Sequence, residues 1–123
     1  MSDVPVAKDE TREGPIPTVW REPLKRIADA LTAGSMPHGD DIRAMDPAAA
    51  RTSFANMEDY PDRLGVLAES AWATSVYIWM RDYWDCLIDL STIKGARSDL
   101  VLQVRVYELG GHIEFAPHLV YVP

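Results

Sequence analysis

The spacing of apolar residues changes once along this chain, close to Gly65. Before Gly65, apolar side chains recur at intervals of three to four residues, which is typical of helices with one buried face. After Gly65, they alternate with polar side chains, which is typical of half-buried β-strands. Helices followed by strands indicate an α+β fold. A chain of 123 residues is long enough for one domain with one hydrophobic core.

The N-terminal part of the chain predicts an arm and two helices. Residues 1–17 have no apolar repeat and are rich in proline, so we expect a flexible arm before a single domain at residues 18–123. A helix at about residues 20–33 would have Pro23 in its first turn and Gly34 after its end. A second helix would begin at Asp46-Pro47 and end by about Asp59. The first helix carries one apolar stripe, formed by Trp20, Leu24, Ile27 and Leu31.

The C-terminal part predicts four strands, at residues 74–80, 84–91, 100–108 and 112–122. Short links, including a tight hairpin at Gly110-Gly111, favour an antiparallel meander. We therefore expect two N-terminal helices packed on one face of a four-stranded antiparallel sheet. The alternation assigns these side chains to the helix-covered face: Trp84, Cys86, Ile88, Leu90, Leu100, Leu102, Val104, Val106, Ile113, Phe115, Leu119 and Tyr121.

Charge and composition restrict the classes of function. The net charge of −7 repels phosphate backbones, so we expect no nucleic-acid partner. There is no apolar run of membrane-spanning length and no evident secretory signal, so we expect no membrane association and a cytoplasmic location. The lone Cys86 falls on the predicted core side, where a thiol is normally an inert small hydrophobe.

One group of residues has the composition of a metal site. His112 and Glu114 are two positions apart on a strand and so point the same way, and His118 is a third candidate ligand. Pro117 argues against this site, because it breaks the strand register before His118. A solvated polar face on an edge strand explains the same residues without a metal, so we expect no cofactor.

A second group predicts a surface that binds a protein. Acidic residues outnumber basic ones between Asp40 and Glu69, and an acidic surface steers basic partners onto itself. Aromatic side chains would provide binding energy, and charged side chains would provide specificity. The predicted partner-binding residues are Tyr77, Trp79, Asp85, Asp89, Arg105, Tyr107 and Glu114.

The chain also resembles an uncharacterised family of small bacterial domains, catalogued as a domain of unknown function. The segments that carry this resemblance are Glu69-Ser70-Ala71-Trp72, Thr74-Ser75-Val76, Trp79, Trp84-Asp85-Cys86-Leu87-Ile88-Asp89-Leu90, Ser98-Asp99-Leu100 and Arg105-Val106, with Trp20, Leu24, Ile27, Leu31 and Gly34. The family brings no established catalytic residues with it. In size, charge and architecture the chain is also similar to immunity proteins of bacterial toxin systems, which cap the active site of a toxin.

Three hypotheses about function follow. The first is a non-enzymatic protein-binding module, an immunity-type protein that neutralises a basic toxin. The second is a small metal-dependent enzyme that uses His112, Glu114 and His118. The third is a homodimer formed through sheet edges or through the face that carries Trp79.

Overall fold

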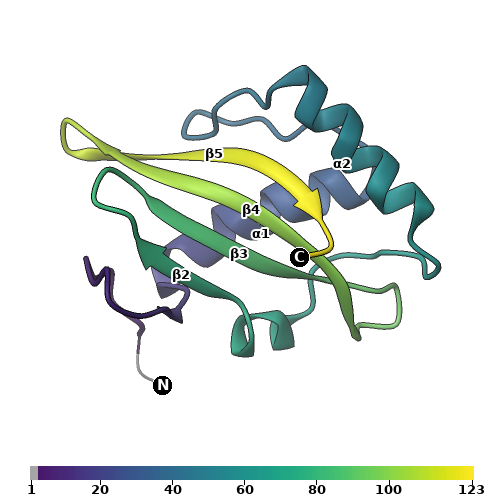
Figure 1. Ribbon diagram of the computed structural model, residues 1–123, viewed down its shortest axis with the longest axis horizontal. Coiled ribbons are helices and arrows are strands. Elements are labelled where there is room, and N and C mark those ends of the chain that lie inside the picture. Colours follow the sequence, from purple (N-terminus) through teal and green to yellow (C-terminus); the bar gives the residue numbers. More distant parts are fainter. Residues whose placement is uncertain (1–2) are drawn as a thin grey trace.

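A computed structural model describes residues 3–123 as one antiparallel sheet with helices on one side and at one edge (Figure 1). The sheet and its helices confirm the predicted α+β class. Short 3₁₀ helices lie at Thr18–Trp20 and Glu69–Ala73. The main elements are β1 (Gly14–Pro15), α1 (Arg21–Thr32), α2 (Pro47–Asp59), β2 (Val76–Trp79), β3 (Trp84–Ser91), β4 (Arg97–Leu109) and β5 (His112–Tyr121).

The sheet has five strands, in the order β1-β2-β3-β4-β5, and every neighbouring pair is antiparallel. The prediction of four strands was therefore wrong. The missed strand is β1, in which Gly14 lies opposite Tyr77 and Pro15 lies opposite Val76. Two residues are too few to leave an alternating pattern in a sequence. Proline is tolerated there because β1 is an edge strand.

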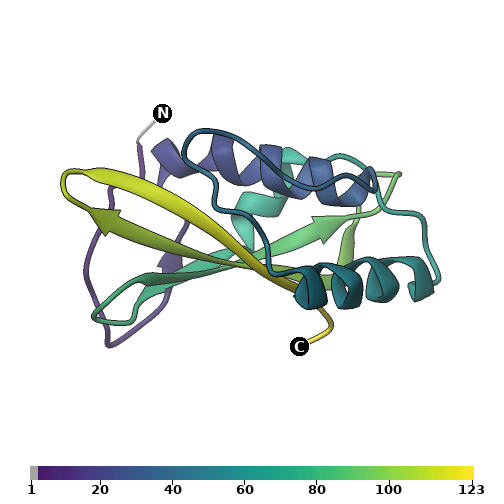
Figure 2. The same cartoon turned by 90° about the horizontal axis from the view of Figure 1, so that it is seen from above.

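Helix α1 covers one face of the sheet (Figure 2) and has the predicted boundaries. Pro23 lies in its first turn, and Gly34 takes a φ of 82° just after its end, which ends the helix at low cost because glycine has no Cβ. The predicted stripe is buried against the sheet, and its residues are Trp20, Leu24, Ile27 and Leu31. Each such side chain contributes about 1.5–3 kcal/mol through burial of apolar surface.

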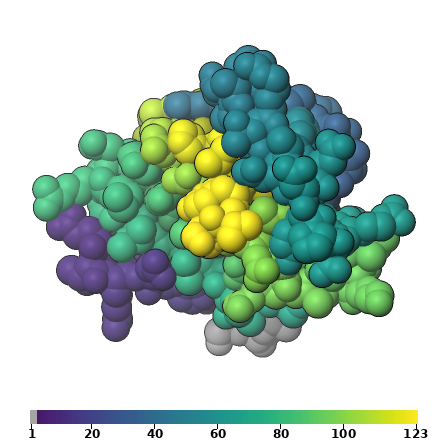
Figure 3. All heavy atoms as spheres, turned by 45° about the vertical axis from the view of Figure 1, so that its right-hand side comes forward, coloured from purple at the N-terminus to yellow at the C-terminus, as the bar shows by residue number. Residues whose placement is uncertain are grey.

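Helix α2 begins and ends as predicted, and the Asp46 side chain caps its first turn by accepting a hydrogen bond from the Ala49 N–H. Its position is not the predicted one, since α2 lies along the outer edge of β5 and not beside α1 on the sheet face. The Ser53 hydroxyl accepts a hydrogen bond of 2.9 Å from the Val120 N–H, and the Asn56 amide donates to the Val120 carbonyl. Figure 3 shows α2 directly against the C-terminal end of β5.

The helices are also not all N-terminal, because α2 lies mid-chain and β1 precedes both helices.

Strand β5 contains an irregularity that changes which side chains face the core. Gln103 pairs with Leu119 and the next residue, Val104, pairs with Pro117, so His118 is an extra residue in β5. Beyond this bulge the alternation is inverted. Leu119 therefore faces away from α1, as does Tyr121 beyond it. Val120 is buried in the core instead, so the predicted faces were wrong for this last segment.

The predicted arm at residues 1–17 includes residues 1–2, which lie outside the described residues. From residue 3 onward the arm contacts the body of the protein. The Thr18 N–H donates to the Val4 carbonyl, for example, and the Ala7 N–H donates to the Tyr77 hydroxyl. The flexibility of the arm and the domain boundary at residue 18 stay predictions. Among residues 3–123, neither α1 nor α2 is long and apolar enough to cross a membrane.

Candidate functional site

The face of the sheet opposite α1, called the open face below, is the face turned to the viewer in Figure 1. Neither α1 nor α2 lies over it, and all its side chains except Val101 are only partly buried. The strand registers place these residues on it: Val76, Ile78, Asp85, Leu87, Asp89, Val101, Gln103, Arg105, Tyr107, Glu114, Ala116, Leu119 and Tyr121.

Polar and apolar side chains are mixed along the rows of the open face. One row across the strands runs Val76, Leu87, Gln103, Leu119. The next row runs Ile78, Asp85, Arg105, Ala116. Recognition surfaces commonly combine apolar contact area with a few fixed polar groups in this way.

Arg105 and Asp85 lie directly opposite each other on β4 and β3, yet they do not form an ion pair. The Asp85 carboxylate instead accepts a hydrogen bond of 2.9 Å from the Gln103 amide. The Arg105 guanidinium lies over the Tyr83 ring, 4.8 Å from its centre. Its Nε atom is buried and has no hydrogen-bond partner within residues 3–123. A buried, unpaired donor of this kind is costly.

Two tyrosine rings lie between two arginines along one side of the open face. The rings of Tyr83 and Tyr107 are in tilted contact, with centres 5.7 Å apart, and Arg105 covers Tyr83. Arg43, from the loop before α2, covers Tyr107 at 4.3 Å. We call this set, Arg43, Tyr107, Tyr83 and Arg105, the arginine–tyrosine ladder. Each ring and guanidinium restricts its neighbour, so the ladder is already ordered in the free protein.

Glu114 holds the Arg43 end of the ladder. Its carboxylate accepts hydrogen bonds from Arg43 Nε at 2.6 Å and pairs with His112 Nε2 at 3.0 Å. The hydrogen bond from Arg43, with a smaller contribution from that of His112, lowers the pKa of the Glu114 carboxyl from its ordinary value. The carboxylate is therefore charged throughout the neutral range.

The structure separates the predicted partner-binding residues into two groups. Asp85, Asp89, Arg105, Tyr107 and Glu114 lie together on the open face. The other two face the α1 side: Tyr77, which is buried with its ring 5.5 Å from that of Trp20, and Trp79, which is half-buried against Trp84.

Sequence reasoning missed two members of the ladder, Tyr83 and Arg43. Tyr83 lies two residues before Asp85 and continues its alternation, but it follows the turn where Arg81 has a φ of 78° and falls outside the predicted strand at residues 84–91. Arg43 is separated from Glu114 by 71 positions in the sequence, and only the fold brings the two together. No sequence signal marks that contact.

The proposed metal ligands form a pair and not a triad. His112 and Glu114 share a face, as expected from their spacing. His118 is the extra residue of the bulge and is exposed. No group of three or more His, Cys, Asp or Glu residues within residues 3–123 is arranged to hold a metal ion.

Cys86 is fully buried on the α1 side of β3. Burial, with a smaller contribution from the nearby Asp85 charge, raises the pKa of its thiol far above the ordinary value. This is the environment of an inert thiol and not that of a nucleophile.

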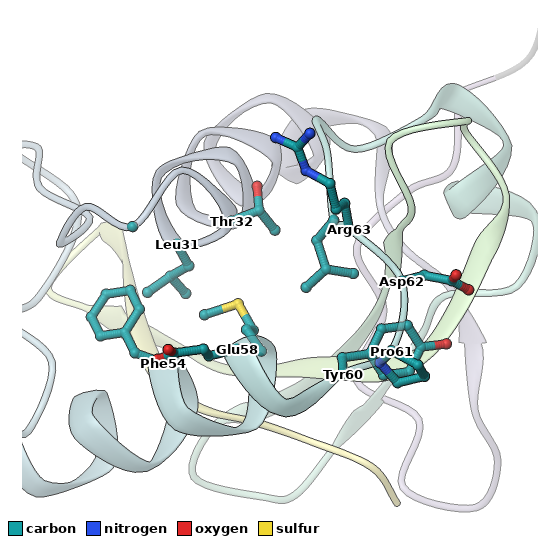
Figure 4. Close-up of a pocket in the computed structure, with 11 residues that line it drawn as sticks. Leu31, Thr32, Phe54, Glu58, Tyr60, Pro61, Asp62 and Arg63 are labelled. Atoms are coloured by element: carbon teal, nitrogen blue, oxygen red, sulfur yellow. The ribbon is translucent and has the colours of Figure 1, made fainter.

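A cleft of about 590 Å³ lies between the C-terminal ends of α1 and α2 (Figure 4). Leu31 and Phe54 lie on one side of it, and Tyr60 and Pro61 lie on the other. The charged side chains of its lining, such as Glu58 and Arg63, are exposed.

Comparison with protein families found a match over most of the chain. A family model described as "Domain of unknown function (DUF7668)" matches residues 27–123. This range contains all of β2, β3, β4 and β5 and so the whole open face. The match confirms the expected resemblance to an uncharacterised family. Comparisons with curated proteins and with solved structures gave no match.

Proposed function

We propose a function for this chain, which belongs to the DUF7668 family of domains of unknown function. It is a non-enzymatic protein-binding module, and its open face binds a basic protein partner. The observation that carries this proposal is the open face itself, an ordered surface on which aromatic, apolar and charged side chains lie uncovered across four strands. Exposed surfaces of this mixed kind commonly mark protein interaction sites.

The arginine–tyrosine ladder supports this proposal because contacts within the protein already hold its side chains in place. Tyrosine and arginine are the residue types that most often carry binding energy at protein interfaces. Binding costs less conformational entropy when such side chains are fixed beforehand. Contacts with Tyr107 and Glu114 fix Arg43, and contact with Tyr83 fixes Arg105.

Charge supports a basic partner. The chain carries a net charge of −7. On the open face, Asp85 and Asp89 accept hydrogen bonds from neutral side chains and form no ion pair with any described residue. Exposed acidic residues continue over the segment that contains α2, namely Asp40, Asp41, Asp46, Glu58, Asp59, Asp62 and Glu69. Such a field accelerates the approach of a basic protein and disfavours acidic competitors.

An immunity-type role is the finer form of this proposal. A small acidic domain with an ordered binding face has the means to cover the active site of a basic toxin and to inhibit it in a one-to-one complex. Under this form, the partner captured from the native host is a basic toxin, and equimolar amounts of this protein abolish the toxin's activity. The cytoplasm is the proposed location of that complex.

The test compares two charge reversals of equal size. The partner is captured from the native host at low salt, identified and purified, and its affinity is measured by calorimetry. The double substitution Asp85→Lys and Asp89→Lys changes the open face. The control, Glu58→Lys and Asp62→Lys, makes the same change on exposed residues outside the open face. We expect binding at least about tenfold weaker for the first variant than for the control.

Circular dichroism and thermal melting establish that both variants are folded. Equal affinities for the two variants would contradict the proposal, as would failure to capture any basic protein at low salt. A dimer detected by light scattering, and lost in the Asp85→Lys and Asp89→Lys variant, would assign the open face to a second copy of this chain. That result would also overturn the proposal.

A further inference from the structure

The N-terminal arm lies beside β2, where Figures 1 and 2 both show the start of the chain against this edge of the sheet. Strand β1 pairs with only two residues of β2. Before β1, the main chain of Val4 forms two hydrogen bonds with Thr18, and the main chain of Ala7 is bound by two aromatic side chains. The Ala7 N–H donates to the Tyr77 hydroxyl at 2.9 Å, and the Ala7 carbonyl accepts from the Trp84 indole N–H at 2.8 Å. Both main-chain polar groups of Ala7 are thus bound by aromatic side chains.

The next residue of the arm, Lys8, occupies a site built from aromatic rings and a carboxylate. Its Nζ atom lies 5.0 Å from the centre of the Trp79 ring and 5.7 Å from that of Trp84. The same atom lies 3.0 Å from the Glu108 carboxylate. We call Tyr77, Trp79, Trp84 and Glu108 the lysine slot. Two ring faces and one acid form a cage that selects an ammonium group.

The two tryptophans of the lysine slot pack in or against the hydrophobic core. Trp84 is only 1% exposed and packs edge-on against Trp20, with ring centres 5.1 Å apart. Trp79 leans on Trp84 at 4.6 Å. The two tryptophans of the slot are therefore anchored in or against the hydrophobic core, whereas Glu108 lies at the surface.

The side chain of Lys8 is held less firmly than the two tryptophan side chains beside it. The side chain of Lys8 is 51% exposed, and that of its partner Glu108 is 50% exposed. The arm's other link to the turn after β2, the ion pair of Glu10 with Arg81, is also at the surface. Solvent-exposed ion pairs contribute little to stability.

The slot residues and Lys8 also differ in whether the family model covers them. All four residues of the slot lie within residues 27–123, which the family model matches. Lys8 lies outside that range, in the part of the chain that the match does not cover. The family match thus covers the slot residues and not the lysine that fills the slot.

We infer that the lysine slot is a binding site for a lysine side chain on an extended segment of a protein partner. In the free protein Lys8 occupies the site as an intramolecular competitor, and the partner's segment displaces the arm. Recognition combines the ammonium group with the main-chain N–H and C=O of the preceding residue. The inference goes beyond the proposed function and does not rest on it, because the slot lies on the α1 side of the sheet and uses none of the residues of the open face.

The test uses the full chain and a synthetic peptide with the sequence of residues 3–13. The indole N–H signal of Trp84, observed by NMR, reports occupancy, because this group binds the residue before the lysine. Substitution Lys8→Ala in the protein weakens the internal competitor. We expect this variant to bind the peptide about two- to fivefold more tightly than the wild-type protein does. The control is Lys25→Ala, which removes a lysine that pairs with Asp29 on α1, and should leave the affinity unchanged.

Three further comparisons complete the test. A peptide with alanine in place of its lysine should bind the Lys8→Ala protein more weakly than the lysine peptide does. Substitution Trp79→Ala in that protein should abolish the preference for lysine. Equal affinity of the wild-type and Lys8→Ala proteins, or of the two peptides, would overturn the inference. So would a dimer that forms by exchange of arms, because the occupant would then be a second copy of this chain.

The outcome is independent of the test of the open face. The Asp85→Lys and Asp89→Lys variant should bind the peptide like the wild-type protein, because both residues lie on the other face of β3. A failure of one proposal is thus distinguishable from a failure of the other.

Discussion

At the scale of single residues, Glu114 joins two distant parts of the chain, since it receives hydrogen bonds from Arg43 in a loop and from His112 on its own strand. These contacts favour the charged carboxylate and lower its pKa. A group whose pKa is lowered on folding stabilises the folded state above its ordinary pKa. That contribution is lost as the pH falls through the folded-state pKa.

We therefore expect Arg43→Ala to raise the pKa of Glu114 toward the ordinary glutamate value, because Arg43 is the largest cause of the lowering. Carbon-detected NMR of the side-chain carboxyl measures this pKa directly. Substitution Arg51→Ala, at an exposed arginine on α2, is the matched control and should leave the pKa of Glu114 in place. An unchanged titration midpoint in Arg43→Ala would show that this ion pair is not formed in solution.

Arg105 illustrates how far sequence reasoning reaches at this scale. The alternating pattern places it on the same face as Asp85 and Asp89, and this placement is correct. The pattern says nothing about the ring of Tyr83, which lies outside the strands and contacts the guanidinium. The face of a strand residue is thus predictable from periodicity, whereas the partner of a long side chain depends on neighbours that the fold brings in.

At the scale of elements, the fastening of α2 to β5 depends on Ser53. Its hydroxyl is completely buried, donates to the Ala49 carbonyl and accepts from the Val120 N–H. Substitution Ser53→Ala leaves that strand N–H buried without a partner, which costs about 1–3 kcal/mol. We expect the free energy of unfolding, measured with a chemical denaturant, to fall by about this amount.

The neighbouring substitution Thr52→Ala provides the control, because Thr52 is exposed on the same helix. It should change the free energy of unfolding by less than about 0.5 kcal/mol. If both variants unfold alike, the hydrogen bond between α2 and β5 does not contribute to stability.

Most elements of this fold were predictable because their residues carry strong local signals. Asp46 and Gly34 mark helix ends through capping chemistry, and long alternating runs mark β3 and β4. The position of α2 was not predictable, because the contacts of Ser53 with Val120 span 67 positions in the sequence. Pro117 indicated a break in register before His118, and the bulge lies there, but the predicted faces of Leu119 and Tyr121 did not take the break into account.

At the scale of the whole molecule, Cys86 lies in the middle of the core, so the reactivity of its thiol measures how readily the core becomes exposed to solvent. The thiol has no exposed surface, and burial raises its pKa, so almost no thiolate exists in the folded protein at neutral pH. We expect a disulfide reagent such as DTNB to leave the native protein unmodified and to react only after unfolding. The labelling rate should rise with denaturant in step with the loss of folded structure.

The labelling rate of Cys86 in the unfolded protein, measured in concentrated denaturant, is the reference rate. Rapid labelling of the native protein would mean that this part of the sheet opens locally, and the interpretation of Cys86 as an inert core residue would fail.

The candidate surface was predictable in part, and again for physical reasons. Alternation along β3 and β4 is sufficient to collect Asp85, Asp89, Arg105 and Tyr107 on one face. It is not sufficient to show that this face is open, because that depends on where the helices pack. The same uncertainty applied to Trp79, whose role depends on an arm that carries no repeat of its own.

The 67-residue separation between Ser53 and Val120 has a consequence for how the protein is made. On the ribosome, α2 is synthesised long before the strand that anchors it. In a growing chain this helix therefore has no strand to pack against. Any product that terminates before Val120 would leave that helix unanchored and the edge of the sheet exposed. Such fragments are the ones on which chaperones and proteases of the cell act first.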